Sequence, residues 1–212
     1  MSNAKLKRKG YAIIISGPSG SGKTSLTRML LKELTNLELS VSITTRYQRE
    51  GEIEGKDYYF TNEKHFLKML ESGEILEYTK LYGNFYGTIK EKVINKFNKG
   101  IDILFDVDSV GAKSLKTELK EDAVSIFILP PSFQELKKRL ISRGQETDSI
   151  IQKRLIAAKS EINKVKNYDY VIYNDELLTA YENIKNIVIG EKNKRHRILN
   201  LESYINNFNS VS

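Results

Sequence analysis

The sequence predicts an α/β fold with a largely parallel sheet flanked by helices, on three observations. Short apolar runs of strand length alternate with segments of helical period along the 212 residues. A glycine-rich turn joins the first apolar run to the first helical segment. Residues 40–88 differ from the rest, because they are rich in Thr, Tyr, Gly and charge. We interpret that segment as a small lobe with its own β-structure, inserted between core strands of a single domain.

Four apolar runs are the expected core strands: Tyr11–Ile15, Ile101–Asp108, Ala123–Leu129 and Tyr170–Asn174. A helix is expected after the first run, because apolar residues recur there at helical spacing at Leu26, Met29, Leu30 and Leu34. Pro130 and Pro131 end the third run, and the charged stretch from Ser132 to Lys166 predicts a long helical segment. The chain from Ala180 onward is predicted to be helical with a frayed end.

Composition excludes several classes of protein. Hydrophobic residues make up 40% and charged residues 29%, which is typical of a globular domain and too apolar for a disordered chain. The absence of cysteine rules out disulfides, iron–sulfur clusters, zinc–thiolate sites and thiol catalysis, and two histidines are too few for a histidine-rich metal site. Apolar stretches reach only about five residues, whereas a membrane-spanning helix needs about 20, so no membrane partner is expected.

The net charge indicates an anionic partner. The chain has 34 basic and 27 acidic residues, giving +7, and this excess fits nucleotides, nucleic acids or lipid headgroups. Basic residues gather at both ends, where we expect solvated tails: Lys5, Lys7, Arg8 and Lys9, then Lys192, Lys194, Arg195, His196 and Arg197. The first basic run is followed by five apolar residues, too few for a signal peptide, so a cytoplasmic protein is expected.

The turn after the first strand matches a phosphate-binding loop. It reads G-x-x-x-x-G-K-[ST], and its glycines let successive backbone N–H groups point at phosphate oxygens. The next helix presents its positive N-terminus to the same anion. Lys23 is expected to reach the terminal phosphates of a nucleoside triphosphate, and the Thr24 hydroxyl to ligate Mg²⁺. The expected nucleotide-binding residues are Gly17, Pro18, Ser19, Gly20, Ser21, Gly22, Lys23, Thr24 and Ser25.

Two carboxylates end the second expected core strand. Asp106 and Asp108 are two residues apart, so that in a strand their side chains point to the same face. In open α/β sheets, ligands bind at the carboxyl ends of the strands. The pair is therefore a candidate to hold Mg²⁺ through water, together with Thr24, or to accept hydrogen bonds from a bound base. The alternative is a pair that faces solvent or caps the next helix.

The inserted segment offers groups that suit a phosphate and a base. Arg46 and Arg49 lie three residues apart and Tyr58 nine further on, and two guanidiniums with a phenol can grip a phosphate dianion. The same segment continues with Glu77, Tyr86 and Thr88. Taken singly, each has a plainer interpretation. The arginines fit surface charges, the tyrosines fit core aromatics, and the glutamate fits a solvated carboxylate.

Taken together, these blocks resemble the guanylate kinase family of nucleoside monophosphate kinases. The resemblance covers residues 13–189, and it is specific because many blocks occur in the family's order. They are GPSGSGKTS, SVSITTR, GEIEGKDYYF, NFYGT, LFDVD with Gly111 after it, ILPPS, RGQETDSIIQKRL and YDYVIYND. The resemblance implies a P-loop NTPase core, an inserted GMP-binding lobe and a mobile helical lid.

The resemblance also implies boundaries and roles. Within one domain it places the core at about residues 11–40, 99–133 and 167–190, the GMP-binding lobe at 41–98, the lid at 134–166 and a C-terminal helix or tail at 191–212. Positions that match those holding the GMP phosphate are Arg46, Arg49, Tyr58 and Tyr86. Positions that match the guanine readers are Ser42, Glu77, Thr88 and Asp106. The lid arginines, expected to stabilise the transferring phosphoryl group with Lys23 and Arg46, are Arg139, Arg143 and Arg154.

The function implied is ATP-dependent phosphorylation of GMP, and of dGMP, to the diphosphate. This step of nucleotide metabolism uses Mg²⁺ and needs no protein nucleophile. The partners expected are ATP and GMP, without nucleic acid, and the sequence fits a monomer or a homo-oligomer. Three alternatives stay open: a kinase for another nucleoside monophosphate, a non-catalytic interaction module of the same fold, and a nucleic-acid-binding ATPase.

The chain departs from the family's pattern at two positions. Gln48 stands where the family usually has proline, and we expect this change to loosen the loop that carries Arg46 and Arg49. Ile43 stands where a polar residue is common, at a position that tolerates change. Neither departure removes a proposed functional side chain.

Overall fold

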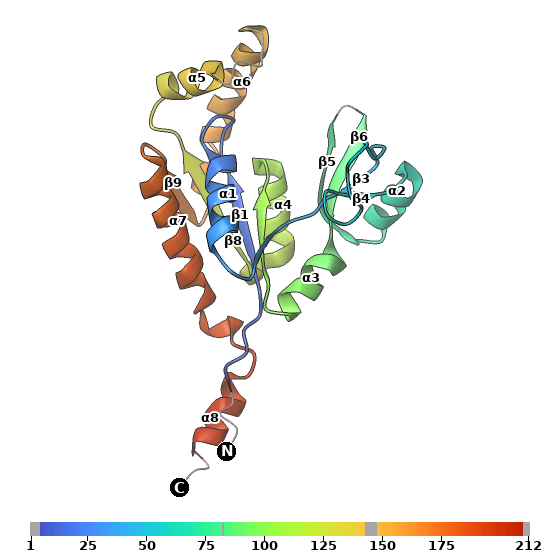
Figure 1. The fold of residues 1–212 in the computed structure, drawn as a ribbon, viewed down its shortest axis with the longest axis vertical. Helices are drawn as coiled ribbons and strands as arrows, with labels where there is room; N and C mark the ends of the chain where they lie inside the picture. Colours follow the sequence, from blue (N-terminus) through green and yellow to red (C-terminus); the bar gives the residue numbers. More distant parts are fainter. Residues whose placement is uncertain (1–4, 82, 143–147, 210–212) are drawn as a thin grey trace.

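The computed structural model describes residues 5–81, 83–142 and 148–209, and its centre is a parallel sheet. Five strands lie in the order β2-β7-β1-β8-β9, and every neighbouring pair is parallel (Figure 1). They are β1 (Ala12–Ser16), β2 (Leu37–Leu39), β7 (Asp102–Asp106), β8 (Ala123–Leu129) and β9 (Tyr170–Tyr173). The α/β fold predicted from the sequence is confirmed. The prediction missed β2 and continued β7 two residues too far.

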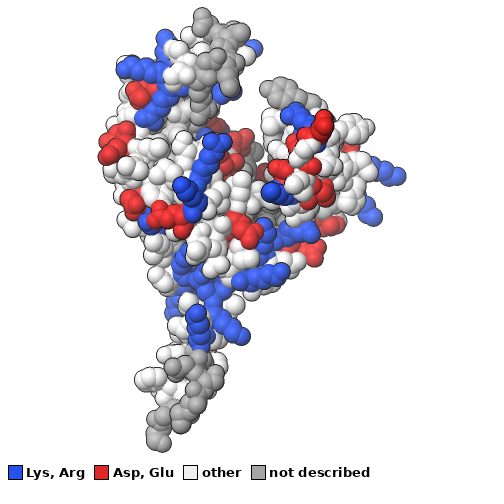
Figure 2. Space-filling view, viewed as in Figure 1, with Lys and Arg blue, Asp and Glu red and all other residues white. Residues whose placement is uncertain are grey.

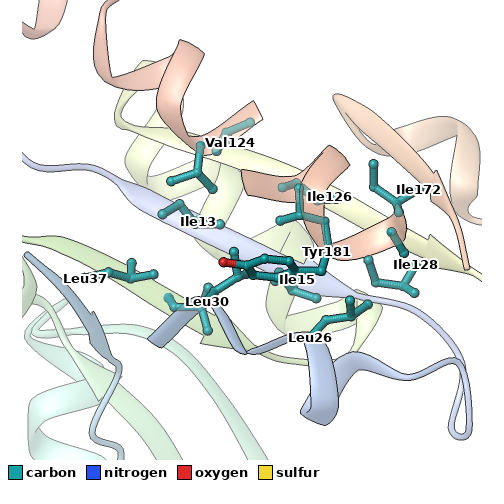
Figure 3. Close-up of a cluster of buried hydrophobic side chains, with 14 of the residues drawn as sticks. Ile13, Ile15, Leu26, Leu30, Leu37, Val124, Ile126, Ile128, Ile172 and Tyr181 are labelled. Atoms are coloured by element: carbon teal, nitrogen blue, oxygen red, sulfur yellow. The ribbon is translucent and has the colours of Figure 1, made fainter. Parts of the chain in front are cut away.

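Helices cover both faces of this sheet, which explains why its central strands β1 and β8 are almost wholly apolar. On one face, Ile13 and Ile15 of β1 pack with residues of α1 (Lys23–Glu33) and α7 (Leu177–Lys192), among them Leu30 and Tyr181 (Figure 3). On the other face, Ala12 and Ile14 pack with α3 (Lys90–Asn98) and α4 (Ser109–Leu119). Alternate residues of β1 therefore serve two separate hydrophobic layers.

The inserted segment forms the expected lobe with β-structure. Its sheet has the order β4-β3-β6-β5, built from β3 (Ile43–Thr44), β4 (Tyr59–Phe60), β5 (Ile75–Leu81) and β6 (Asn84–Ile89). Helix α2 (Glu63–Glu71) begins at the N-cap residue Asn62, whose Oδ1 accepts a hydrogen bond from the His65 N–H at 2.8 Å. The helix packs on the sheet through Phe66, whose ring stacks on Phe85 with centroids 5.1 Å apart. The lobe thus has a core of its own.

The charged stretch after β8 folds as two helices. They are α5 (Phe133–Ser142) and α6 (Asp148–Ile162), whereas the sequence predicted one long helical segment. Leu136 of α5 and Ile151 of α6 belong to one buried cluster, together with Leu140, Leu155 and Ala158. In a continuous helix, residues this far apart would be separated by roughly 22 Å along the axis, at 1.5 Å per residue. Burial of both apolar stripes therefore requires the chain to turn back.

The two chain ends lie side by side (Figure 1), joined by backbone hydrogen bonds from Lys9 N to Arg197 O and from Leu199 N to Lys7 O, each 2.8 Å long. The solvated tail expected at the C-terminus is wrong for Arg197, whose side chain is 1% exposed. Its guanidinium lies 4.1 Å from the centre of the Tyr11 ring and pairs with Glu191 at 3.2 Å. These partners, which charge pattern alone does not reveal, offset the cost of burying the charge.

Short 3-10 turns and one further helix complete the described chain. The turns are η1 (Lys120–Asp122), η2 (Val165–Asn167) and η3 (Arg195–Arg197), and the last helix is α8 (Leu201–Asn209). Figure 1 shows α8 projecting from the end of the molecule opposite to α5 and α6. Among the described residues, no helix combines the length and the apolar character needed to cross a membrane.

Candidate active site

The phosphate-binding loop joins β1 to α1 at the carboxyl edge of the parallel sheet. Gly22 has a φ of 101°, and a Cβ added to it would lie 2.3 Å from Asn174 Nδ2. Gly20 has a φ of 87°, and an added Cβ would lie 3.1 Å from Leu136 of α5. Glycine is therefore required at both places by the backbone and by the close approach of Asn174 and α5.

Lys23 and Thr24 begin α1 beside the loop that they are expected to serve. Lys23 Nζ donates to the carbonyl oxygens of Gly17 at 2.6 Å and Pro18 at 3.2 Å, so the ammonium lies over the loop. Asp106, at the end of β7, faces this group across the sheet edge. Burial raises the pKa of the Asp106 carboxyl, while the charge of Lys23 and a hydrogen bond with Thr24 oppose that rise.

A cavity of about 400 Å³ opens over the loop. Its lining includes Gly17, Ser19, Gly20, Gly22, Lys23, Thr24, Asp106, Val107, Asp108 and Glu161. Figure 2 shows the molecular surface hollowed between the part that contains α5 and α6 and the inserted lobe. The expected phosphate-binding and carboxylate residues therefore meet in one concave site.

Asp108 does not share a strand face with Asp106, because β7 ends at Asp106. Asp108 instead caps α4, where its Oδ1 accepts hydrogen bonds from the backbone N–H groups of Val110 at 3.0 Å and Gly111 at 2.9 Å. This outcome is the capping alternative. The carboxylate still lines the cavity, although the geometry expected for the pair was wrong.

The expected phosphate-gripping residues of the lobe gather around one arginine. The Arg46 guanidinium carbon lies 5.2 Å from the centre of the Tyr58 ring, and Tyr58 meets Tyr86 edge-on with centroids 6.0 Å apart. Arg46 Nη2 also pairs with Glu52 Oε1 at 2.6 Å. Hydrogen bonds with Glu52 and Tyr86 raise the pKa of Arg46. Arg49 is exposed nearby, and its backbone N–H donates to Glu52 Oε2 at 2.8 Å.

The expected base-reading residues lie where the lobe meets the core. Thr88 Oγ1 donates to Glu77 Oε1 at 2.7 Å, which leaves Oε2 directed toward α4. A Cβ added to Gly111 would lie 3.4 Å from Glu77 Oε2 and 3.6 Å from Asp108 Oδ1, so the two carboxylates are neighbours. Burial raises the pKa of Glu77, the charge of Asp108 adds to the rise, and the hydrogen bond from Thr88 opposes it. Ser42 is half-buried next to β3.

Two of the three expected lid arginines contact the loop or its support. Arg154 Nη1 donates to Ser19 Oγ in the phosphate-binding loop at 3.0 Å. Arg139 pairs with Glu135 at 3.1 Å, and its Nη1 and Nη2 both donate to the backbone oxygen of Asn174 at 3.3 Å. Arg143 lies outside the described residues. Arg154 thus reaches the phosphate-binding loop itself, and Arg139 reaches Asn174, whose side chain contacts that loop.

Comparison with known proteins agrees with this geometry. A sequence model of the guanylate kinase family matches residues 9–191. The chain belongs to the guanylate kinase family. It is 44% identical over 194 residues to a guanylate kinase of Clostridioides difficile, covering 92% of this chain and 94% of that one. It is 43% identical over 206 residues to a guanylate kinase of Ehrlichia chaffeensis, covering 97% and 98%. The crystal structure of guanylate kinase from Anaplasma phagocytophilum aligns with a TM-score of 0.73 at 35% identity, covering 98% of this chain and 99% of that one.

Three residues of this guanylate kinase site were not predicted from the sequence. Asn174 is 2% exposed, and its Nδ2 donates to the Ser21 carbonyl of the phosphate-binding loop at 2.6 Å. Glu161 lines the cavity, and its Oε1 accepts from Ser109 Oγ and Lys164 Nζ, each at 2.9 Å. Glu52 organises the arginine turn. A signal existed for two of them, because Asn174 and Glu52 stand inside blocks that carried the resemblance.

Proposed function

We propose that this guanylate kinase transfers the γ-phosphoryl group of ATP to GMP, and to dGMP, with the phosphate-binding loop holding the donor and the lobe holding the acceptor. One observation carries the proposal. Asp108 lines the cavity over the loop and is also a neighbour of Glu77, so the donor and acceptor halves adjoin. We further propose the division into core (11–40, 99–133, 167–190), GMP-binding lobe (41–98), lid (134–166) and C-terminal segment (191–212).

The acceptor phosphate is assigned to Arg46, Arg49, Tyr58 and Tyr86. The guanidinium of Arg46 is already oriented by Glu52 and the tyrosines, so little side-chain freedom is lost on binding. A dianion between Arg46 and Arg49 would accept charge-assisted hydrogen bonds from both. Holding the attacking oxygen in this way is the main contribution of the lobe to a reaction that needs no protein nucleophile.

The base of the acceptor is assigned to Glu77, Thr88, Ser42 and Asp106. Guanine presents the N1–H and the exocyclic N2 amino group as donors, and a carboxylate such as Glu77 accepts from both. Adenine has no donor at N1 and no amino group at C2, so it would leave the carboxylate unpaired. The bond from Thr88 fixes one oxygen of Glu77 and so fixes the plane of the carboxylate. This arrangement supports selection of guanine over adenine.

The transferring group is assigned to Lys23, Arg46 and the lid arginines Arg139, Arg143 and Arg154. Lys23 is within reach of the loop that would hold the β- and γ-phosphates, and Arg154 already contacts Ser19 there. Cations at these places stabilise negative charge that develops on the phosphoryl oxygens. Closure of the lid would also exclude water and so prevent hydrolysis of ATP.

Magnesium fits the oxygen atoms that the loop offers. Thr24 and Asp106 are hydrogen-bonded to each other beside Lys23, and Asp108 lies on the same cavity. Among the described residues, no group of three or more His, Cys, Asp or Glu side chains gathers as a metal site. A small number of protein ligands is what Mg²⁺ needs, because the ion keeps several waters and binds through one or two side chains and the substrate's phosphates. When bound, the ion would neutralise charge on those phosphates.

A coupled assay with GMP, dGMP, AMP, UMP and dTMP as acceptors tests the proposal, with ATP as donor. We expect GMP and dGMP to be phosphorylated and the other three to react at least about 100-fold more slowly, because a polar site left unpaired rejects the wrong base strongly. Equal rates with AMP would refute the guanine site, and no transfer to any acceptor would favour a non-catalytic module. The proposal places the reaction in the cytoplasm, where ATP and GMP are available.

A further inference from the structure

The turn from Arg46 to Glu52 is closed by hydrogen bonds that converge on its last residue. The two carboxylate oxygens of Glu52 bind Arg46 Nη2 at 2.6 Å and the Arg49 backbone N–H at 2.8 Å. The Glu52 N–H donates to the Arg49 carbonyl at 3.2 Å. Glu52 therefore sets the position of both arginines that the proposed function assigns to the acceptor phosphate.

Gln48 adds a further bond across this turn. Its side-chain Nε2 donates to the Glu52 backbone carbonyl at 2.6 Å, although the residue itself is exposed. The bond joins residue 48 to residue 52, so that the part of the turn that carries Arg49 cannot open without breaking it. Sequence reasoning expected Gln48 to loosen this loop, because proline would have restricted it. The structure adds a contact that this expectation did not include, since the longer amide side chain supplies a tether.

We propose that Gln48 is a positioning residue for the acceptor phosphate. Its amide holds the turn closed in the absence of substrate, and this keeps the Arg46 and Arg49 guanidiniums at the spacing that one phosphate dianion needs. The inference rests on the proposed function of these two arginines. A turn that is open before binding has to be ordered by the ligand, and the entropy of that ordering is subtracted from the affinity.

Proline would restrict the same turn by another route, which provides a rescue variant. Gln48 has a negative φ, and its backbone N–H donates to no acceptor in the described part of the chain, so a pyrrolidine ring would break no backbone hydrogen bond of the turn and would cost only the side-chain bond of Gln48. The preceding side chain, Tyr47, is 94% exposed and leaves room for the ring. Proline also reduces the freedom of the open turn.

The experiment compares Gln48→Ala, Gln48→Pro and the control Gln152→Ala, which removes the same amide from an exposed position of α6. Calorimetric titration with GMP and steady-state kinetics at saturating ATP give the Kd and KM of GMP, the KM of ATP and kcat. We expect Gln48→Ala to weaken GMP binding about three- to tenfold, as loss of one hydrogen bond implies, with kcat and the KM of ATP within about twofold. Gln48→Pro should restore the affinity, and the control should match the parent protein.

A double-mutant cycle with Arg49→Ala separates positioning from a general effect of the loop. If Gln48 acts by holding the arginines, the loss of GMP affinity caused by Gln48→Ala should be at least about threefold smaller in a protein that also carries Arg49→Ala. Unchanged GMP affinity in Gln48→Ala, or a Gln48→Pro protein as weak as Gln48→Ala, would overturn the proposal. Arg46→Ala is measured in parallel. If Arg46→Ala leaves GMP binding unchanged, the assignment of the phosphate site is wrong. If Arg46→Ala weakens binding strongly and Gln48→Ala does not, the phosphate site stands and only the proposed role of Gln48 is refuted.

Discussion

Replacement of Glu77 by glutamine tests how the site distinguishes guanine. The change preserves size and leaves one carbonyl oxygen, which can still accept the Thr88 hydroxyl at the position that Glu77 Oε1 occupies. The other oxygen becomes an NH₂ group, which opposes a donor of guanine where the carboxylate accepted from it. The variant therefore removes one charge-assisted hydrogen bond and adds a clash between two donors, without opening a cavity.

The size of the effect follows from the lost bond. A hydrogen bond to a charged group contributes about 1.5–3 kcal/mol, and an unpaired buried donor costs a further amount of similar size. We therefore expect kcat/KM for GMP to fall by at least about 2 kcal/mol, or about 30-fold. Folding should not suffer. Burial raises the pKa of Glu77, so the charged carboxylate already weakens the folded state once the pH exceeds that pKa, and the neutral amide removes this penalty.

Kinetics as a function of pH complete the test. Because the folded pKa of Glu77 is raised, its carboxylate takes up a proton at a higher pH than an ordinary glutamate, and kcat/KM for GMP should fall as the pH is lowered through that pKa. The Glu77→Gln variant lacks this group, so that part of its acid-side decline should disappear. Thermal unfolding measured alongside is expected to show no loss of stability. A variant with parental GMP kinetics would show that Glu77 does not read the base.

Three other predictions address catalysis, stability and motion. Lys23→Ala should reduce turnover at least about 100-fold while calorimetry shows nearly unchanged GMP binding, because Lys23 belongs to the donor half of the site. Near-normal turnover would show that the assignment of the phosphate-binding loop is wrong. Arg197→Met should lower the free energy of unfolding by about 3 kcal/mol, since it leaves Glu191 buried without one partner. The midpoint of thermal unfolding should then fall by roughly 6–12 °C, and an unchanged midpoint would show that the pair does not stabilise the fold. Small-angle scattering should give an open ligand-free form, partial closure with GMP and the smallest radius of gyration with a bisubstrate inhibitor. The same radius in every state would exclude a hinged mechanism.

The sequence predicted the elements whose signal is local. β1 and β8 are almost wholly apolar because helices cover both of their faces, and the phosphate-binding loop is recognisable by glycines that the backbone requires. β2 was missed because it has three residues, Leu37–Leu39, of which two are exposed. It exists through pairing with β7, a partner far away along the chain. Residues that owe their structure to distant partners carry little signal in a single sequence.

The same distinction applies to the candidate site. Arg46 and Tyr58 could be grouped because their spacing and chemistry suit a phosphate, and the family resemblance added Tyr86. The structure brings these three together. The sequence left the cap formed by Asp108 as one of two alternatives, and it gave no sign that Arg197 would be buried. The cap depends on where α4 begins, and the burial of Arg197 depends on the contact between the two chain ends. Local charge patterns do not record such three-dimensional pairings.

The central place of β1 in the sheet has a consequence for synthesis. β1 leaves the ribosome well before its sheet partners, which are residues 103–106 of β7 and 123–127 of β8. The phosphate-binding loop likewise waits for Asn174, whose amide holds the Ser21 carbonyl. A growing chain therefore exposes an unpaired apolar strand until β7 has been synthesised, at about 5–20 residues per second. Nascent chains of this protein are accordingly candidates for chaperone protection, and the phosphate-binding loop gains its full set of contacts only after residue 174 has been added.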